Sequence, residues 1–455
     1  MRDSAHCPLS PIRRNRQRIV ILRRYIFIHL DPIGAAPLNA SPPTVAQTFD
    51  PARERALLLT LAGIQFAHIL DFMIMMPLGP MLMRELQVGT HEFGLLVSAY
   101  TFSAAFSGLL AAMFIDRFER KRMLLNLFAL FALATLACGL AAGFRSLLLA
   151  RCAAGAFGGV LGSMVYTLVG DLIPFERRGS ASGTVMSAFA VATIAGVPLS
   201  LFLANRFGWR FPFVFIAVIA CGLLVVAWKV LPQLRGHLEH PPNVDAKRTH
   251  PLASVQAVLR DNNCIKALIF MAMVMFASFS VIPFITIHLT FNVGVLPDDI
   301  PLIYLVGGAA TFATSRLIGH LADKFGKVKM YRIVALGSIA PLLIQTHLPP
   351  APLWLVVCAT TLFFILVSGR MTPAMAIVTS AVEPRLRGTF LSMNGAIQQL
   401  ASGAAAYVGG TLISSAASGR IAGYGEVGYL AVFATGVAVY FVGTLRLYGG
   451  SPHSP

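Results

Sequence analysis

Long runs of apolar residues, rather than alternating or helical stripes, dominate the hydrophobic pattern of the chain. Residues 93–115, 123–144 and 179–205 contain no Asp, Glu, Lys or Arg. Because about 20 helical residues cross the hydrocarbon core of a bilayer, such runs predict membrane-spanning helices. Twelve can be counted, at 56–83, 93–115, 123–144, 146–170, 179–205, 211–231, 265–291, 300–321, 330–347, 352–379, 388–415 and 427–446.

Composition and charge agree with a multi-pass membrane protein. Hydrophobic residues make up 56% of the chain and charged residues 12%, whereas soluble domains have about 45–50% and 25%. Of the 36 Lys and Arg residues, 28 fall on the side of the termini, 5 on the other side and 3 within spans. This bias predicts that both termini are cytoplasmic, in the inner cell membrane. The net charge of +17 then reflects topology, and we expect no nucleic-acid partner.

A charged segment occurs twice and divides the chain into two copies of one unit. GHLADKFGKVK at 319–329 has a degraded copy, AMFIDRFERKR, at 112–122, and their aspartates are 207 positions apart. PFERRG at 174–179 returns as PRLRG at 384–388, with the Arg-Gly pairs 209 apart. The repeat predicts an all-α polytopic membrane protein whose twelve transmembrane helices form two pseudo-symmetric six-helix halves.

The repeat also predicts the domain organisation. The two halves comprise residues 55–231 and 263–447, joined by a cytoplasmic linker at 232–262 that contains the short amphipathic stretch PLASVQAVLRD. Residues 1–54 form a basic segment whose apolar stretch, RIVILRRYIFIHL, is too short and too charged to span. We interpret the segment as a disordered tail or an upstream extension of the gene. Residues 448–455 form a C-terminal tail.

The repeated segment matches G-x-x-x-D-(R/K)-x-G-(R/K), placed between helices two and three of each half. With the duplication, it resembles the signature of the major facilitator superfamily, in which this turn latches the closed cytoplasmic side. The resemblance implies a gating role for the matching residues. These are Gly319, Asp323, Lys324, Gly326 and Lys327 in the second half and Asp116, Arg117, Arg120 and Lys121 in the first, where Ala112 and Glu119 replace the glycines.

Four further motifs narrow the resemblance. Arg151 with Gly155 in span four resembles the family's helix-four motif, and GVPLS, with Gly196 and Pro198, resembles the antiporter-type motif of helix five. LDFMIMMPLGP in span one and SGRMTPAMA in span ten resemble the twelve-helix drug:proton antiporters and the sugar-efflux, arabinose-efflux-like exporters. The resemblance covers residues 55–447. It implies a monomer in the lipid bilayer that exports a small-molecule substrate, with the proton gradient as its energy source and no cofactor.

Few charged residues lie inside the spans, and each is a functional candidate because insertion costs about 2.5–3.5 kcal/mol. Asp71 is the single acid deep in a span, His68 lies one turn earlier on the same face, and Pro77 interrupts the helix that follows. We predict that Asp71 carries the coupling proton, with His68 as a relay and Arg151 setting its proton affinity. A fixed structural pair between Asp71 and Arg151 is the alternative.

The predicted substrate cavity draws on both halves. Met75 offers an adaptable apolar lining, with a lipid-facing role as its alternative. Arg370 in span ten has no acid at its depth, so an anionic substrate or Gln398 and Gln399 of span eleven are its predicted partners; backbone carbonyls are the alternative.

These features predict a secondary transporter that exports small organic molecules by alternating access. Uptake symport and uncoupled facilitation remain as alternatives, and a membrane sensor or scaffold is the alternative of a different class. The sequence has no nucleotide-binding loop and no catalytic triad, and its six cysteines lack metal-ligand spacing. We therefore expect neither an enzyme, nor an ATP-driven pump, nor a metal site.

The gating role of the second charged turn can be tested with Asp323→Asn. We expect normal expression and insertion but sharply lower turnover, because the carboxylate that holds the neighbouring helix is lost while the helix itself is unchanged. Turnover of purified protein in vesicles, normalised to inserted protein, measures this. Wild-type turnover by the inserted variant would refute the latch.

Overall fold

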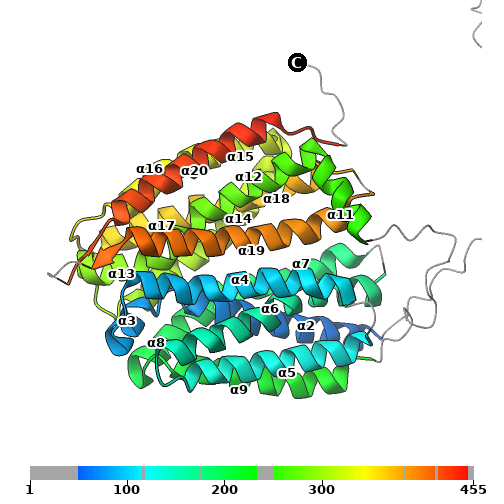
Figure 1. The fold of residues 1–455 in the computed structure, drawn as a ribbon, viewed down its shortest axis with the longest axis horizontal. Coiled ribbons are helices and arrows are strands. Elements are labelled where there is room, and N and C mark those ends of the chain that lie inside the picture. The colour runs from blue at the N-terminus through cyan, green and yellow to red at the C-terminus, as the bar shows by residue number, and fades with distance from the viewer. Residues whose placement is uncertain are drawn as a thin grey trace, which may run out of the picture. The chain divides into compact units, whose positions relative to one another are not determined.

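The apolar runs of the sequence form long helices arranged in two groups, which a computed structural model describes for residues 50–114, 118–174, 177–232, 251–383, 385–415 and 419–448. These residues belong to one compact unit, Thr48–Pro455. Figure 1 shows the N-terminal half, from blue to green, beside the C-terminal half, from green to red.

The N-terminal half contains the first six spans. Its elements are α2 (Pro51–Ile74), α3 (Gly79–Leu86), α4 (Thr90–Phe114), α5 (Arg120–Gly139), α6 (Phe144–Leu172), α7 (Arg178–Val191), a π-helical turn (Ala192–Gly196), α8 (Val197–Phe207) and α9 (Phe211–Val230). α2 begins at Pro51, so the helix starts three residues before the predicted end of the tail at residue 54. Proline suits this first turn, where its missing N–H has no helical partner.

The C-terminal half repeats this order. Its elements are α11 (Pro251–Arg260), α12 (Asn262–Phe279), a 3-10 turn (Ile282–Phe284), α13 (Ile285–His288), a π-helical turn (Leu289–Val293), α14 (Ile300–Phe325), α15 (Lys327–Gly337), α16 (Ile339–Thr346), α17 (Leu353–Gly369), α18 (Met371–Ser380), α19 (Arg387–Leu412), the two-residue strands β1 (Ser414–Ser415) and β2 (Ile421–Ala422), and α20 (Tyr424–Thr444). The small antiparallel ribbon of β1 and β2 was not predicted. α11 coincides with the amphipathic stretch of the predicted linker; the linker residues 233–250 lie outside the described residues.

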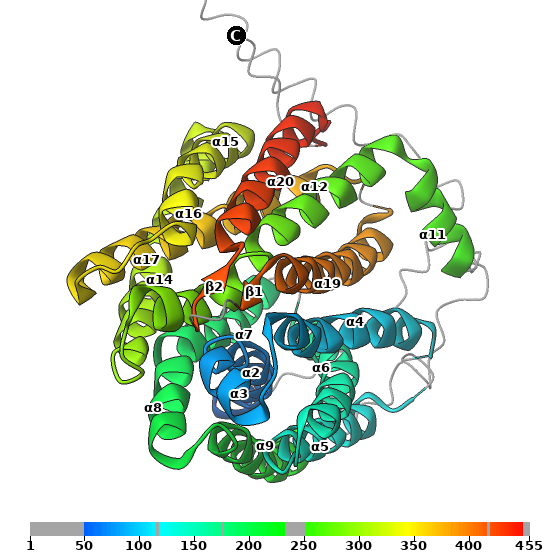
Figure 2. The same ribbon diagram turned by 60° about the vertical axis from the view of Figure 1, so that its left-hand side comes forward.

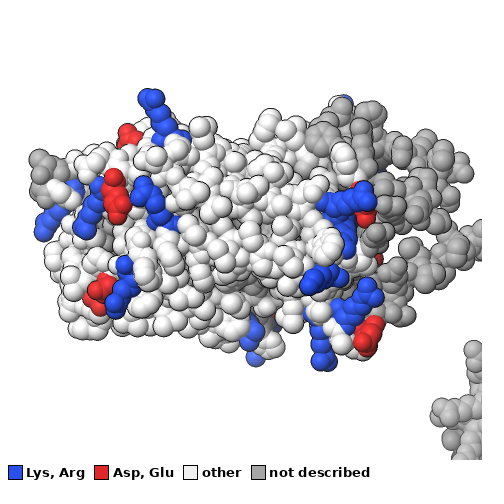
Figure 3. Space-filling view, turned by 90° about the horizontal axis from the view of Figure 1, so that it is seen from below, with Lys and Arg blue, Asp and Glu red and all other residues white. Residues whose placement is uncertain are grey.

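Eleven helical segments of the described chain are long and apolar enough to cross a membrane. The one predicted span that is not among them is the eleventh, at 388–415. It corresponds to α19, which has 26 residues but carries more Gly, Ser, Gln and Asn than the others. Figure 3 shows charged side chains gathered towards both ends of one face, with a broad uncharged band between them. Exposed apolar side chains such as Phe106, Leu133 and Val218 fit a surface that faces lipid.

The first helix of each half is interrupted at the same point of the repeat. α2 ends at Ile74, and Pro77 lies in the turn before α3; α12 ends at Phe279, and Pro283 lies in the turn before α13. Proline cannot donate the backbone hydrogen bond that would continue the helix. We call the end of the bundle that holds α3 and α13 the far end, and the end that holds Gly326 and the start of α2 the turn end.

The two halves meet along α4 and α19, and along α14 against α7, the π-helical turn and α8, as Figure 2 shows. A Cβ atom on Gly94 of α4 would lie 2.8 Å from the Ala406 carbonyl and 3.1 Å from the Gly410 Cα of α19. At the far end, the Thr90 hydroxyl donates to the Ile413 carbonyl. The backbones of α4 and α19 approach this closely because glycine has no side chain there.

Gly94→Val should therefore destabilise the contact between the halves by about 1–3 kcal/mol, the usual cost of overpacking. Gly108→Val is the matched control, because it lies on the same helix and a Cβ there would meet nothing within 4 Å. Thermal unfolding in detergent measures both. Equal melting temperatures for the two variants would contradict this account of the seam.

Candidate functional site

A buried ion pair lies inside the N-terminal half, between α2 and α6. The Arg151 Nη1 donates to the Asp71 carboxylate at 3.0 Å and to the Asp71 backbone carbonyl at 3.2 Å. The side chains of Asp71 and Arg151 are 0% and 1% exposed. Asp71 is the one carboxylate that is buried among the described residues. The structure thus joins the two residues that the sequence singled out.

Aromatic side chains enclose this pair. The Arg151 guanidinium lies over the Tyr100 ring of α4, 4.4 Å from its centroid, and the Tyr100 hydroxyl is 2.9 Å from the His68 Nδ1. Phe72 of α2 packs on Tyr100, with ring centroids 5.3 Å apart. His68, which was predicted as a relay, is therefore hydrogen-bonded to the Tyr100 hydroxyl, and the Tyr100 ring in turn contacts Arg151 of the ion pair.

Glycines of α6 make room for the pair. Gly155 packs on the backbone of Tyr100, Gly158 on the side chains of Tyr100 and His68, and Gly159 on Ala104 of α4. Small residues allow such close helix approach in membranes. A larger side chain at Gly158 would clash with the Tyr100 hydroxyl and displace the Tyr100 ring.

Several buried polar atoms of this site have no hydrogen-bond partner. They include the second carboxylate oxygen of Asp71, the Nε of Arg151 and the hydroxyl of Thr135 on α5, and Thr135 lies beside Asp71. We call His68, Asp71, Tyr100, Thr135 and Arg151 the Asp71 cluster. Its unused carboxylate oxygen can accept a proton without first breaking the bond to Arg151.

The helix-five motif lies against α2. A Cβ on Gly196 would lie 2.9 Å from Leu70 and 3.2 Å from Phe66, so Gly196 contacts the residue that precedes Asp71. Pro198 follows the π-helical turn, and its missing N–H leaves the carbonyl of Ile194 without the usual helical donor. The motif thus positions the helix that carries Asp71.

The predicted cavity residues do not form one group in this structure. Arg370 is fully buried, and it donates to the hydroxyls of Thr435 at 2.9 Å and Ser278 at 2.8 Å rather than to Gln398 or Gln399. Met75 is 0% exposed and packs in the core. Gln398 and Gln399 are half-buried on α19, and the Gln398 amide lies 3.9 Å from the sulfur of Met375.

The charged turns make equivalent connections in the two halves. Arg120 pairs with Asp171 at the end of α6, and Lys327 donates to the Ser380 hydroxyl at the end of α18 at 3.1 Å. Gly326 has φ +92°, which favours glycine, whereas Glu119 in the first half is extended. Asp116 and Arg117 lie outside the described residues.

The other residues of the second turn are exposed or loosely packed. Asp323 and Lys324 are exposed at the end of α14, and a Cβ on Gly319 would lie 3.4 Å from the Thr372 side chain. Within the described residues Asp323 forms no ion pair.

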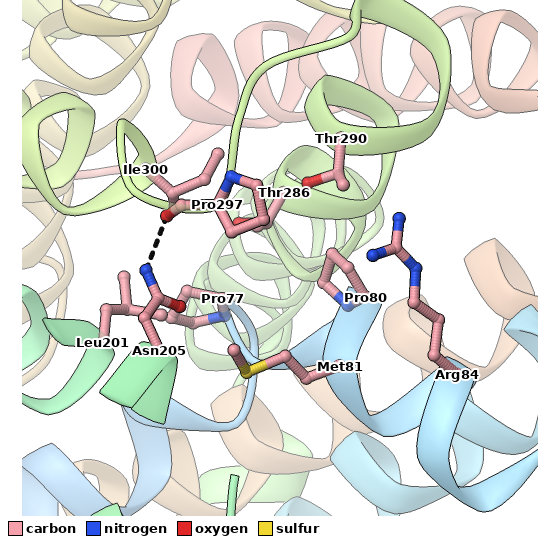
Figure 4. Close-up of a pocket in the computed structure, with 10 residues that line it drawn as sticks. All are labelled: Pro77, Pro80, Met81, Arg84, Leu201, Asn205, Thr286, Thr290, Pro297 and Ile300. Atoms are coloured by element: carbon pink, nitrogen blue, oxygen red, sulfur yellow. Dashed lines mark hydrogen bonds between the residues drawn. The ribbon is translucent and has the colours of Figure 1, made fainter. Parts of the chain in front are cut away.

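A small cavity lies at the far end, between the two halves (Figure 4). It encloses about 80 Å³ and is lined by Pro77, Pro80, Met81, Arg84, Leu201, Asn205, Thr286, Thr290, Pro297 and Ile300. The Asn205 amide donates to the Pro297 carbonyl at 2.8 Å. Sites for organic ligands measure about 300–1,000 Å³, so this cavity marks a closed seam rather than a substrate site.

Sequence reasoning missed Tyr100, Thr135, Ser278 and Thr435. Hydroxyl residues occur throughout the spans, so composition does not distinguish them. Ser278 alone had a signal, because it lies 207 positions after Asp71, the spacing of the repeated aspartates.

Comparison with known proteins decides the family. The sequence model of the Major Facilitator Superfamily matches residues 61–406 and, again, 268–455. The chain belongs to the major facilitator superfamily. Members of this superfamily with related sequences include the "Uncharacterized MFS-type transporter YceJ" of Bacillus subtilis, 25% identical over 85% of this chain and 94% of the relative.

Two further comparisons show what the chain is similar to. The "Probable sugar efflux transporter" of Helicobacter pylori strain P12 is 28% identical over 53% of this chain and 59% of the relative. The fold matches the crystal structure of a D-xylose-proton symporter with a TM-score of 0.68 and 17% identity, over 85% of this chain and 97% of that one. This last likeness concerns the fold alone.

Asp71 and Arg151 should be energetically coupled. Removing one partner of a buried pair leaves an uncompensated charge and costs about 3–5 kcal/mol. We expect Asp71→Asn and Arg151→Gln each to lower the free energy of unfolding, and the double variant to lose much less than the sum of the two. Denaturant unfolding in detergent measures the cycle, with Arg145→Gln, an exposed arginine at the start of α6, as the control. Additive losses would contradict a direct coupling.

Proposed function

We propose that this major facilitator superfamily transporter exports small organic molecules in exchange for protons, with Asp71 as the proton carrier. The observation that carries the proposal is the Asp71 cluster. It holds the one buried carboxylate of the described residues, paired with Arg151 yet with one oxygen free of hydrogen bonds. A proton on Asp71 would weaken that pair, and release of the proton would restore it.

The cluster is connected to the contact between the halves. Phe72, next to Asp71, packs on Tyr100 within the cluster and on Phe279 of α12, with ring centroids 5.9 Å apart. Asp71 also lies one turn before the interruption between α2 and α3. Movement of the C-terminal half against α2 therefore reaches the Asp71–Arg151 pair through Phe72, which supports alternating access coupled to proton binding.

The contacts between the halves support a state closed at the far end. Asn205 bonds to Pro297 and to Asp298, Thr90 bonds to Ile413, and the Arg84 guanidinium lies 5.1 Å from the Phe291 ring centroid. Given the excess of Lys and Arg at the turn end, we propose that the turn end is cytoplasmic and the state inward-facing. The exposed Asp323 fits a cytoplasmic latch that is open in this state.

The relatives favour efflux of sugars or sugar-like molecules, because one of them is named a sugar efflux transporter. The fold neighbour named a D-xylose-proton symporter supports a second candidate, proton-coupled uptake. Either candidate function would use Asp71 as the protonatable carboxylate. The two functions therefore differ only in the direction in which substrate and proton move.

Asp71→Asn should abolish transport driven by a pH gradient, because no other buried carboxylate among the described residues can replace it. Purified protein in vesicles, assayed with a panel of radiolabelled sugars and an internal pH dye, measures sugar and proton movement together. Sugar movement opposite to the proton gradient indicates exchange, and movement along with it indicates symport. Sugar counterflow, which needs no net proton movement, should survive in the variant.

Glu426→Gln, which changes an exposed carboxylate on α20, is the control and should transport normally. Arg151→Ala should shift the pH dependence of transport rather than abolish it, since the carrier remains. Normal pH-driven transport by Asp71→Asn would overturn the proposal and leave uncoupled facilitation or coupling to another ion.

A further inference from the structure

A second buried arginine lies in the C-terminal half, and no carboxylate of the described residues pairs with it. Arg370 is 0% exposed, at the junction of α17 and α18. Its Nη1 and Nη2 donate to the hydroxyl oxygens of Thr435 and Ser278. Both hydroxyls in turn donate to backbone carbonyls, of Ala431 and Val274. Within the described residues Arg370 forms no ion pair, and its Nε has no hydrogen-bond partner.

The internal repeat shows how this differs from the N-terminal half. Ser278 lies 207 positions after Asp71, and Arg120 and Lys327 have the same spacing. Helix α12 is also interrupted just after Ser278, as α2 is after Asp71. Arginine on the fourth span of each half thus contacts the equivalent position of the first, where one half has a carboxylate and the other a hydroxyl.

The missing carboxylate leaves a positive charge without a counter-charge. Arginine stays protonated in proteins, and an ion removed from water costs several kcal/mol even after relaxation. Hydroxyl oxygens carry only partial negative charge, so Ser278 and Thr435 do not offset this cost. A bound anion would offset the cost of burying the Arg370 charge.

Two hydrogen-bond donors remain for such an anion. One is the Nε–H of Arg370. The other is the hydroxyl of Tyr331 on α15, which is fully buried, has no hydrogen-bond partner and lies close enough to Arg370 to interact with it electrostatically. A guanidinium edge together with a hydroxyl is suited to a carboxylate or a small inorganic anion.

We propose that Arg370 and Tyr331 form a buried site for one singly charged anion, either the carboxylate of an organic ligand or a free halide. The site lies at the interruption between α17 and α18, where Pro373 cannot donate to the carbonyl of Gly369. Transporter sites commonly lie beside such interruptions. The anion enters when the junction of α17 and α18 opens. This goes beyond proton coupling at Asp71, which lies in the other half.

The test is thermal unfolding of the purified full-length protein in detergent, titrated with sodium chloride or sodium acetate. Ionic strength is kept constant with the sodium salt of a bulky sulfonate buffer. We expect a saturable rise in melting temperature for the wild type and none for Arg370→Gln. Tyr331→Phe loses one donor to a charged ligand, so its half-saturating concentration should rise about tenfold.

Ser278→Asp is the decisive variant. It supplies the carboxylate that Asp71 supplies in the other half, so it should fold with an internal ion pair and lose the response to anions. Ser278→Ala keeps the uncompensated charge and should retain the response. Arg84→Gln, which removes an exposed arginine at the far-end cavity, should also retain it.

Each outcome decides a point. A response to chloride alone identifies a free inorganic anion, and a tighter response to acetate identifies a carboxylate ligand. A wild type without a saturable response, or a full response in Arg370→Gln or Ser278→Asp, overturns the site. The measurement uses no gradient and no transport, so its result tests the anion site independently of the proposed role of Asp71.

Discussion

A charge buried in this protein needs a partner other than the surrounding lipid, which offers none. The Asp71–Arg151 pair meets that constraint in the N-terminal half and organises what surrounds it. α2 and α6 supply the two charges, α4 supplies the Tyr100 ring under the guanidinium, and glycines on α6 let these helices close around the pair. The helix-five motif packs against α2, the helix that carries Asp71, and Phe72 of α2 contacts the C-terminal half. α2 itself ends shortly after Asp71.

The contact between the halves obeys a different requirement. The backbones of the two halves must approach each other closely. Glycines on α4 and α19, and Gly308 of α14 against the backbone of the π-helical turn, allow this approach. Polar contacts such as those of Asn205 lie at the far end, where they can break and form as the halves move.

The two halves share a plan but differ in chemistry. Arg120 pairs with Asp171 in the N-terminal half, and Lys327 makes the equivalent contact with Ser380 in the C-terminal half. In the same way, Arg151 contacts Asp71 in the first half and Arg370 contacts Ser278 in the second. In both cases serine replaces the carboxylate in the C-terminal half. The two halves thus share the geometry of these contacts but not their charge, and Asp71, the one buried carboxylate of the described residues, lies in the N-terminal half.

The sequence by itself determined the membrane fold, the order of the spans and the two-fold repeat. Long uncharged runs, proline interruptions and repeated charged turns are local patterns, and helices in lipid must satisfy their backbone hydrogen bonds within each segment. It also singled out Asp71, His68 and Arg151, because charge and ionisable groups are rare inside spans. It also predicted that Arg151 would act on Asp71.

Tertiary structure alone decided which side chains share a site. The Tyr100 ring under Arg151, the hydroxyls around Arg370 and the burial of Met75 depend on how helices rotate and pack, which span lengths and hydropathy do not specify. Gln398 and Gln399 were among the predicted partners of Arg370, together with an anionic substrate and backbone carbonyls, yet Arg370 donates to side chains of α12 and α20. A side chain on a helix can face any of several neighbours, and only the packing of the complete bundle selects one.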